Sequence, residues 1–313
     1  MSRPYEKPVI LKLETGYLNK FGSSPAYARK VREEIAGASI EDLTGAFGSP
    51  LFVFSEAAMR ERYRQVHEAF STRYPNVVQA WSYKTNYLKA ICAIFHDEGA
   101  LAEVVSEFEY EKARALGVPG RDIIFNGPHK TRSALLRAVE EGAQIHVDHL
   151  DEIQDLEQIA EELGRPIPVG LRLNMDTGIH PQWTRFGLNL DSGQAMDAVK
   201  RIHARGHLVL RGLHAHIGTF ILSPEAYGVE TAKMAGFARE VTDRLGYEIE
   251  YLDVGGGFPS RSHLKGTYLP PDVTIQPLDR YAEAITDALY ANLTPGAFPR
   301  LILETGRALV DEA

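Results

Sequence analysis

The chain has 313 residues, of which 44% are hydrophobic and 24% are charged, and its formal net charge is -8 at pH 7. This composition is typical of a globular protein with one large core, and the negative charge argues against a nucleic-acid-binding protein, which needs a basic face. The single cysteine, Cys92, excludes an internal disulfide and lies in an apolar run typical of a buried core. No apolar run reaches membrane-spanning length and the N-terminus lacks a signal-peptide core, so we expect a cytoplasmic protein.

The first part of the chain carries few structural signals. Residues 1–40 show no clear hydrophobic period, and we expect an N-terminal extension with one helix near residues 25–36. A turn signal then precedes a candidate strand over residues 51–54. The helix predicted over residues 56–70 has Ser55 as its candidate N-terminal cap.

From there on, apolar strand candidates alternate with helix-like segments. The eight strand candidates cover residues 77–83, 100–105, 122–126, 144–148, 167–174, 208–215, 249–254 and 300–304. Helix-like segments between them include residues 131–141, 150–163, 193–205 and 224–245. This alternation indicates parallel βα units, and eight units predict a closed (β/α)8 barrel of the TIM type over residues 41–313. An open doubly wound α/β sheet is the alternative.

Polar residues or glycines follow the C-terminal ends of the predicted strands, where the chemistry of such a barrel gathers. In chain order they are Lys84, Ser106, Asn126, Asp148, Arg172 with Asn174, His214 with His216, Gly255 to Gly257, and Glu304. We therefore expect these side chains to surround one site.

Lys84 stands where a strand passes into a helix. An amine there is costly to desolvate unless it has a partner or a chemical task. Formation of a Schiff base with an aldehyde cofactor is one such task. A solvated lysine at a strand end is the alternative, and the stretch alone leaves both open.

Two segments are candidate phosphate sites. Gly255 to Gly257 would let backbone N–H groups approach a phosphate closely, although a tight turn alone also needs glycines. The second segment runs from His216 to Thr219, and Thr219 offers a hydroxyl. His216 could lie flat on an aromatic ring, or it could be a hydrogen-bonded core histidine. His214 and His216 also have a spacing that could hold a metal. No carboxylate or thiol motif completes that pair, so we expect no metal.

Glu304 ends the last predicted strand and could face the pyridine nitrogen of a cofactor. A carboxylate there keeps the nitrogen protonated, so that the ring accepts electrons from the α-carbon of a substrate. Arg307 could bind a phosphate or a substrate carboxylate with its planar fork. An exposed Glu–Arg pair that contributes little is the alternative.

Together these motifs resemble the barrel domain of the fold-type III pyridoxal-phosphate decarboxylases, a family that includes diaminopimelate, ornithine and arginine decarboxylases and is related to alanine racemase. The match covers residues 48–313. The corresponding motifs are Tyr83 to Asn86 for Y-x-K-x-N, Leu171 to Asn174 for the arginine strand, Arg185 to Leu188 for [RK]-F-G, His216 to Thr219 for H-x-G-S, Asp253 to Pro259 for D-x-G-G-G-F-P, and Glu304 to Arg307 for E-P-G-R.

The resemblance implies an alanine-racemase-like barrel that binds pyridoxal 5'-phosphate as an internal aldimine of Lys84. It implies catalytic roles for Lys84, His216 and Glu304, with Arg172 near the ring hydroxyl and Arg307 also available to the substrate. The resemblance implies that Thr219, Gly255, Gly256, Gly257 and the backbone of Gly306 and Arg307 hold the phosphate, and it includes Thr305 among the cofactor-binding residues.

The sequence departs from the family pattern in ways that bear on the substrate. Thr219 replaces a serine, Thr305 replaces a proline, and residues 106–109 replace a glycine-rich S-G-G-E stretch. Residues 174–180 do not reproduce the T-H-x-x-x-x-T-G stretch of diaminopimelate enzymes. The family's β-rich second domain, with its cysteine, acidic residue and tyrosine, would follow the position of Ala313.

We therefore expect a cytoplasmic pyridoxal-phosphate-dependent decarboxylase for a diaminopimelate-, ornithine- or lysine-like amino acid. We expect a homodimer, or a partner chain that supplies the missing β domain of the family, and this chain could also be a fragment of a longer protein. A non-catalytic carrier barrel for the cofactor is the alternative. A third hypothesis is an amino-acid racemase, but the presence of Glu304 argues against it.

Overall fold

The computed structural model describes residues 33–261 and 274–313, in which the chain divides into two compact units. The smaller unit comprises residues 1–53 and 261–274. In its described part, β1 (Glu34–Ile35) pairs antiparallel with β2 (Ala38–Ser39), and α1 (Ile40–Phe47) follows. The helix expected near residues 25–36 lies mostly outside the described residues, and it is wrong where β1 replaces it.

The strand expected over residues 51–54 is also wrong. The segment is an irregular connection that pairs with no strand in the described part of the chain. Its apolar, aromatic composition favours a strand, but a strand also needs a hydrogen-bonding neighbour. The sequence-based barrel boundary at residue 41 stays a prediction.

The larger unit, residues 54–260 and 275–313, contains a closed barrel of eight parallel strands. Its strands are β3 (Val77–Ser82), β4 (Leu101–Val104), β5 (Ile123–Phe125), β6 (Gln144–Val147), β7 (Ile167–Asn174), β9 (Leu208–Ala215), β10 (Tyr251–Asp253) and β11 (Arg300–Thr305). They neighbour one another in chain order, β11 pairs with β3 to close the ring, and the short β8 (Leu188–Asn189) is attached to β7. The predicted (β/α)8 barrel is confirmed, and the open sheet is excluded.

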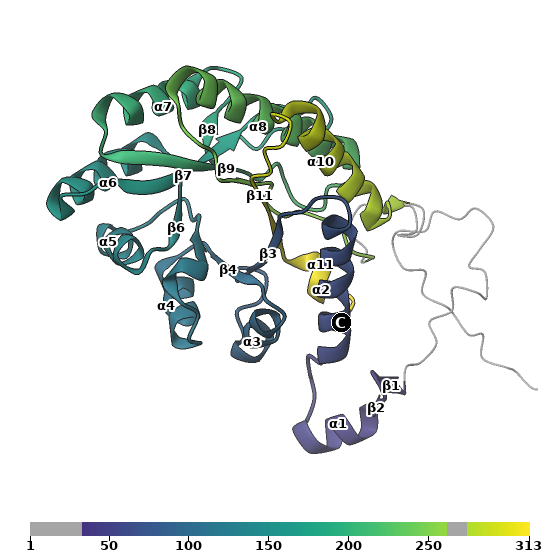
Figure 1. The fold of residues 1–313 in the computed structure, drawn as a ribbon. Helices are drawn as coiled ribbons and strands as arrows, with labels where there is room; N and C mark the ends of the chain where they lie inside the picture. Colours follow the sequence, from purple (N-terminus) through teal and green to yellow (C-terminus); the bar gives the residue numbers. More distant parts are fainter. Residues whose placement is uncertain (1–32, 262–273) are drawn as a thin grey trace, which may run out of the picture. The chain divides into compact units, whose positions relative to one another are not determined.

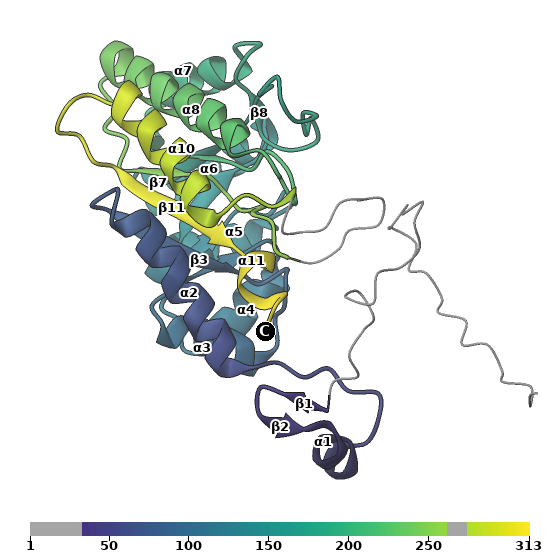
Figure 2. The same ribbon diagram turned by 90° about the vertical axis from the view of Figure 1, so that its right-hand side faces the viewer.

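Helices surround the barrel on its outside (Figures 1 and 2). They are α2 (Glu56–Ser71), α3 (Lys89–Asp97), α4 (Glu107–Ala115), α5 (Arg132–Glu141), α6 (Leu150–Leu163), α7 (Gln194–Arg205), α8 (Pro224–Leu245), α10 (Leu278–Asn292) and the short α11 (Arg307–Val310), with a 3-10 turn at Gly120–Asp122. The side chain of Ser55 accepts a hydrogen bond from the Ala58 N–H, which confirms it as the cap of α2. No helix in these described ranges is long and apolar enough to cross a membrane.

Two apolar layers hold the barrel unit together. The larger core packs the inner faces of the helices against the strands and includes the fully buried Cys92, as predicted. A smaller cluster joins residues of four strands across the barrel: Ala80, Ile124, Tyr251 and Ile302. Strands buried on both faces explain why the sequence shows continuous apolar runs instead of alternation.

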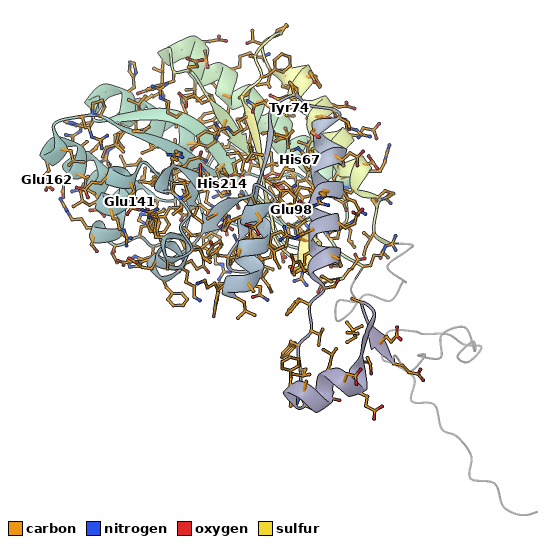
Figure 3. All side chains as sticks on the ribbon, turned by 60° about the horizontal axis from the view of Figure 1, so that its bottom comes forward. His67, Tyr74, Glu98, Glu141, Glu162 and His214 are labelled. Carbon is orange, nitrogen blue, oxygen red and sulfur yellow. The ribbon has the colours of Figure 1, made fainter. Side chains whose placement is uncertain are left out.

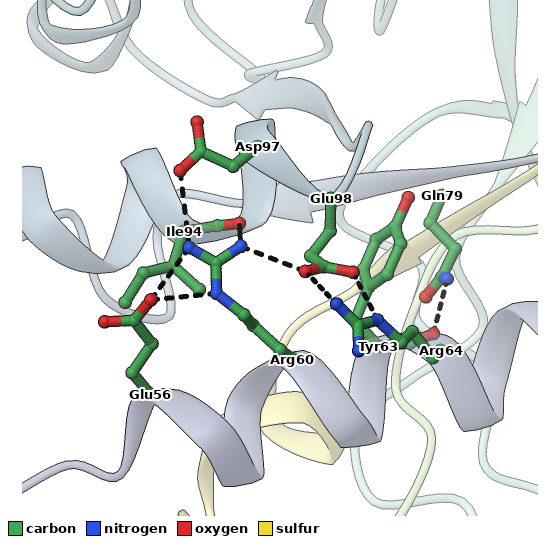
Figure 4. Close-up of polar contacts among 8 residues, drawn as sticks. All are labelled: Glu56, Arg60, Tyr63, Arg64, Gln79, Ile94, Asp97 and Glu98. Carbon is green, nitrogen blue, oxygen red and sulfur yellow. Dashed lines mark hydrogen bonds and ion pairs between the residues drawn. The ribbon is translucent and has the colours of Figure 1, made fainter.

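Helix α2 is joined to α3 by a carboxylate that two arginines share (Figure 4). Glu98, which caps the C-terminus of α3, accepts from Arg60 Nη1 at 2.9 Å and from Arg64 Nε at 2.8 Å. On the same helix, the Tyr63 carbonyl accepts from Gln79 Nε2 of β3 at 2.9 Å. These contacts hold α2 beside β3, the strand that leads to Lys84.

A buried ion pair connects the ends of β5 and β6. Lys130 Nζ donates to the carbonyls of Gly127 (2.7 Å) and His146 (2.8 Å) and to Glu152 Oε1 (2.7 Å), and both charged side chains are almost fully buried. The other Glu152 oxygen accepts from the Asp148 N–H at 2.8 Å. The pair therefore fixes two strand ends next to the mouth of the barrel.

We expect Lys130→Met to lower the free energy of unfolding by about 3–5 kcal/mol, because it leaves the buried Glu152 carboxylate without its partner. Urea denaturation followed by circular dichroism measures this loss. The control is Lys200→Met, which removes an exposed ion pair with Asp197 and should change little. Equal losses in the two variants would contradict the prediction.

Candidate active site

Lys84 lies just after β3 at the mouth of the barrel and is paired with a fully buried carboxylate. Its Nζ donates to Glu103 Oε2 on the adjacent β4, and Ser82 Oγ lies 3.5 Å away. Burial alone would lower the pKa of Lys84, but the charges of Glu103 and Glu304 outweigh it and raise the pKa. Burial raises the pKa of Glu103, against the effect of Lys84. Glu103 is therefore placed to exchange a proton with the lysine amine.

Glu304, at the end of β11, is 3% exposed and has neighbours from two other strands. It accepts a hydrogen bond from Asn126 Nδ2, and His214 Nε2 lies 3.5 Å from its Oε1. Burial alone would raise the pKa of Glu304, but nearby His214 and the charge of Lys84 hold it well below its ordinary value. Glu304 is therefore an ionised acceptor in the barrel interior, where Figure 3 shows His214.

The glycine turn after β10 packs so tightly that side chains are excluded. A Cβ at Gly256 would lie 2.2 Å from the Glu304 carbonyl oxygen, and one at Gly257 would lie 2.3 Å from the Gly218 carbonyl oxygen. The Gly255 and Gly256 N–H groups donate to Asp253 Oδ1 (2.9 Å) and His216 Nδ1 (3.0 Å). Among the described residues, no partner meets the N–H of Gly257. The turn thus brings the two predicted phosphate segments together.

His216 is held in one orientation by its neighbours. Its Nδ1 accepts the Gly256 N–H, and its ring meets that of Trp183 edge to face, with centroids 5.6 Å apart. Burial and the charge of Lys84 lower the pKa of His216 to about 3. The ring is therefore neutral at neutral pH, as a stacking partner for an aromatic cofactor requires.

The predicted arginines border the same mouth. Arg172 Nη1 lies 3.3 Å from Asp148 Oδ1, and its guanidinium lies 4.7 Å from the Phe186 ring centroid. Arg307 begins α11, with its guanidinium 5.7 Å from the Phe220 ring centroid.

The smaller predicted residues differ in their exposure. Thr219 is exposed, whereas the Thr305 hydroxyl is buried and donates to Gln79 Oε1 at 3.3 Å. A Cβ at Gly306 would lie 2.2 Å from Thr85 Oγ1, so the end of β11 closely approaches the segment after Lys84. The structure thus brings the predicted residues to one end of the barrel, and their individual roles stay predictions.

Several neighbours of these residues were not predicted. Glu103 is the clearest, and the sequence contained a signal for it, because it is a charged residue inside an apolar strand.

His146, His214, Asp253 and Glu304 form a buried cluster, in which one ligand atom from each residue lies within 4.8 Å of the others. The sequence showed no carboxylate beside His214, but the fold supplies two. The expectation of no metal stays a prediction.

The comparisons with known proteins agree with this geometry. Residues 56–311 match the pyridoxal-binding domain of the pyridoxal-dependent decarboxylases, so the chain belongs to that family. It is 31% identical to a diaminopimelate decarboxylase of Methanocaldococcus jannaschii over 292 residues, which cover 89% of this chain and 65% of the relative. It is 30% identical to the Bacillus subtilis diaminopimelate decarboxylase, covering 90% of this chain and 65% of that protein.

A solved structure gives the same result. The crystal structure of the M. jannaschii diaminopimelate decarboxylase in complex with L-lysine has a TM-score of 0.78 and 30% identity, and the match covers 88% of this chain and 65% of that one. The chain thus spans about two thirds of the length of these relatives, at 65%.

The residues present fit a pyridoxal phosphate cofactor. An amine for the aldehyde (Lys84), an ionised acid for the ring nitrogen (Glu304) and a neutral ring for stacking (His216) lie at one end of the barrel. The Gly257 N–H, unpartnered within the described ranges, and the close approach at Gly306 provide backbone suited to a phosphate.

We expect His146, His214 and His216 to lower the free energy of unfolding as the pH drops from 7 to 5. Burial lowers the pKa of His146, His214 and His216, so below the ordinary histidine value the unfolded chain binds protons that the folded chain excludes. Each histidine contributes a slope of up to about 1.4 kcal/mol per pH unit. The lowered pKa of Glu304 acts in the same sense at lower pH, because the stability that it adds is lost as the pH falls below about 4.5. The raised pKa values of Glu230 and Asp253 act in the opposite sense, because the folded chain keeps protons that the unfolded chain has lost.

Urea denaturation of the wild type and of His216→Asn at pH 7, 6 and 5 measures this dependence. The variant should show a shallower fall than the wild type. Parallel curves would contradict the assignment of His216 as a partly buried, neutral ring.

Proposed function

We propose that the protein is a pyridoxal-phosphate-dependent decarboxylase of an amino acid that carries a second amino group. The observation that supports this most strongly is that Lys84 and the ionised Glu304 lie at the same mouth of the barrel and influence each other's pKa. An amine can hold the cofactor's aldehyde there, while a carboxylate keeps the proton on its ring nitrogen.

When bound, the cofactor supplies an electron sink for the pair left on the substrate α-carbon as CO2 departs. Lys84 would hold the aldehyde, and Glu103 would take up the proton that the lysine must lose to react. Lys84, with its Nζ beside the Glu103 carboxylate, could also carry a proton to or from the substrate. Glu304 would hold the ring-nitrogen proton in place throughout, because its charge is buried where water does not screen it.

His216 would lie against one face of the cofactor ring, since Trp183 and the Gly256 N–H fix its plane. The backbone of Gly255 to Gly257 and of Gly306, with Thr219 and Arg307, would bind the phosphate. Arg172, anchored by Asp148, would lie near the ring hydroxyl, and Arg307 is also available to the substrate carboxylate.

The substrate class rests on relatives. The M. jannaschii and B. subtilis proteins are diaminopimelate decarboxylases, and one was solved with L-lysine. We propose a diaminopimelate-, ornithine- or lysine-like substrate, action in the cytoplasm, and assembly as a homodimer or with a partner chain.

We expect Lys84→Ala to abolish the visible absorbance that pyridoxal phosphate gives when it is bound covalently to the protein. The reason is that the variant lacks the amine that reacts with the aldehyde. The matched control is Lys89→Ala, an exposed lysine at the start of α3, which should retain the band. Absorbance titration of each apoprotein with the cofactor is the measurement. A full band in Lys84→Ala would exclude the assigned role.

We expect Glu304→Gln to bind the cofactor but to lose turnover on the order of 100-fold, because an amide cannot hold the ring nitrogen protonated. The assay is release of labelled CO2 from diaminopimelate, ornithine, lysine and arginine. If the wild type binds the cofactor but releases no CO2 from any of these four amino acids, the result favours a non-catalytic carrier of the cofactor. Unchanged turnover in the variant would remove the role of Glu304.

A further inference from the structure

Three aromatic rings from different strands are stacked inside the barrel beneath Glu304. The rings of His146 (β6) and His214 (β9) have centroids 4.8 Å apart and planes inclined by 21°, and Tyr251 (β10) lies 5.6 Å beyond His146 at 28°. Both histidines are fully buried, and Tyr251 is 6% exposed. The stack therefore crosses the barrel interior and ends at the acid of the proposed site.

Two strand glycines create the space for this stack. A Cβ at Gly170 would lie 2.3 Å from Tyr251 Oη and 2.7 Å from His146 Cδ2, and a Cβ at Gly212 would lie 2.1 Å from the Tyr251 ring. A central strand loses packing and stability at a glycine. Glycine is therefore required at both positions, because the rings occupy the space that a side chain would need.

Hydrogen bonding assigns the tautomer of His146. Its Nε2 lies 3.1 Å from the side-chain amide of Gln144, which donates to it. The proton then resides on Nδ1, which has no partner in the described part of the chain. The ring is therefore held by stacking and by one hydrogen bond from its own strand.

The charges in the stack favour a fixed, neutral arrangement. Burial lowers the pKa of both histidines, so neither ring repels the other at neutral pH. Burial and the charge of Glu304 raise the pKa of Asp253, so the neighbouring acid keeps its proton. Among His146, His214, Asp253 and Glu304, the ionised residue is then Glu304. The orientation of the His214 ring sets the contact between its Nε2 and Glu304 Oε1.

We propose that His146 is a positioning residue that holds the His214 ring in the plane from which it orients Glu304 toward the cofactor's ring nitrogen. This inference rests on the proposed function. It assigns a role to a residue that touches neither Lys84 nor the phosphate segments, and it gives a reason for a flat ring at this position.

The test compares the full-length wild type with His146→Ala, which removes the stacked ring, and with His146→Phe, which keeps a planar ring without nitrogen atoms. Each protein is loaded with pyridoxal phosphate labelled with 15N in the ring, and the 15N shift reports protonation of that nitrogen. In His146→Ala we expect the shift to move toward that of an unprotonated pyridine, and kcat to fall about 10- to 100-fold with a small change in KM. His146→Phe should retain the wild-type shift and most of kcat.

His203→Ala is the matched control, because His203 makes an edge-to-face contact with Tyr247 on the outside of the barrel. It should leave shift and kcat unchanged. A wild-type shift in a folded His146→Ala would overturn the inference, as would an equal loss in His146→Phe. If His146→Ala does not fold, the outcome for His146→Phe decides.

The two proposals fail differently. A wild type that binds the cofactor but releases no CO2 from any amino acid would refute the proposed decarboxylation, while the 15N shift would still decide the role of His146. A wild type that binds no pyridoxal phosphate would refute both.

Discussion

The burial of one ionised carboxylate, Glu304, is the constraint on which the site depends. A charge in a barrel interior is stable only where polar groups replace water. Asn126 and His214 contact it, and Lys84 contributes an opposing charge, from three other strands. Closure of the ring, with β11 paired to β3, is what allows these strands to face one another across the interior. The acid and the fold therefore support each other.

The sequence predicted the barrel and its mouth well, because both depend on local pattern. Continuous apolar runs marked all eight barrel strands, and a lysine, a glycine run and a glutamate at strand ends marked the site. The strand expected over residues 51–54 was wrong because composition does not show whether a neighbouring strand exists. The two-residue β8 was missed for the opposite reason, since pairing with β7 makes it a strand despite its shortness.

Contacts across the barrel could not be predicted. Nothing near Lys84 in the chain indicates that Glu103 lies against it, and nothing near Glu304 points to His146, 158 positions earlier (304 − 146). Family resemblance identified residues that touch the cofactor, but the buried groups behind them depend on which strands face each other. The departures from the family pattern at residues 106–109 and 174–180 follow β4 and β7, at the same end of the barrel as these groups.

The absence of side chains at Gly170 and Gly212 has a consequence for how this interior can change over time. The Tyr251 ring fills the space beside both glycines. Substitutions at positions 170, 212 and 251 are therefore coupled to one another. A larger residue at position 212 becomes tolerable only once Tyr251 is replaced by a smaller residue, and one at position 170 also requires the His146 ring to move. Lineages that depart from this arrangement should therefore do so at all three positions together.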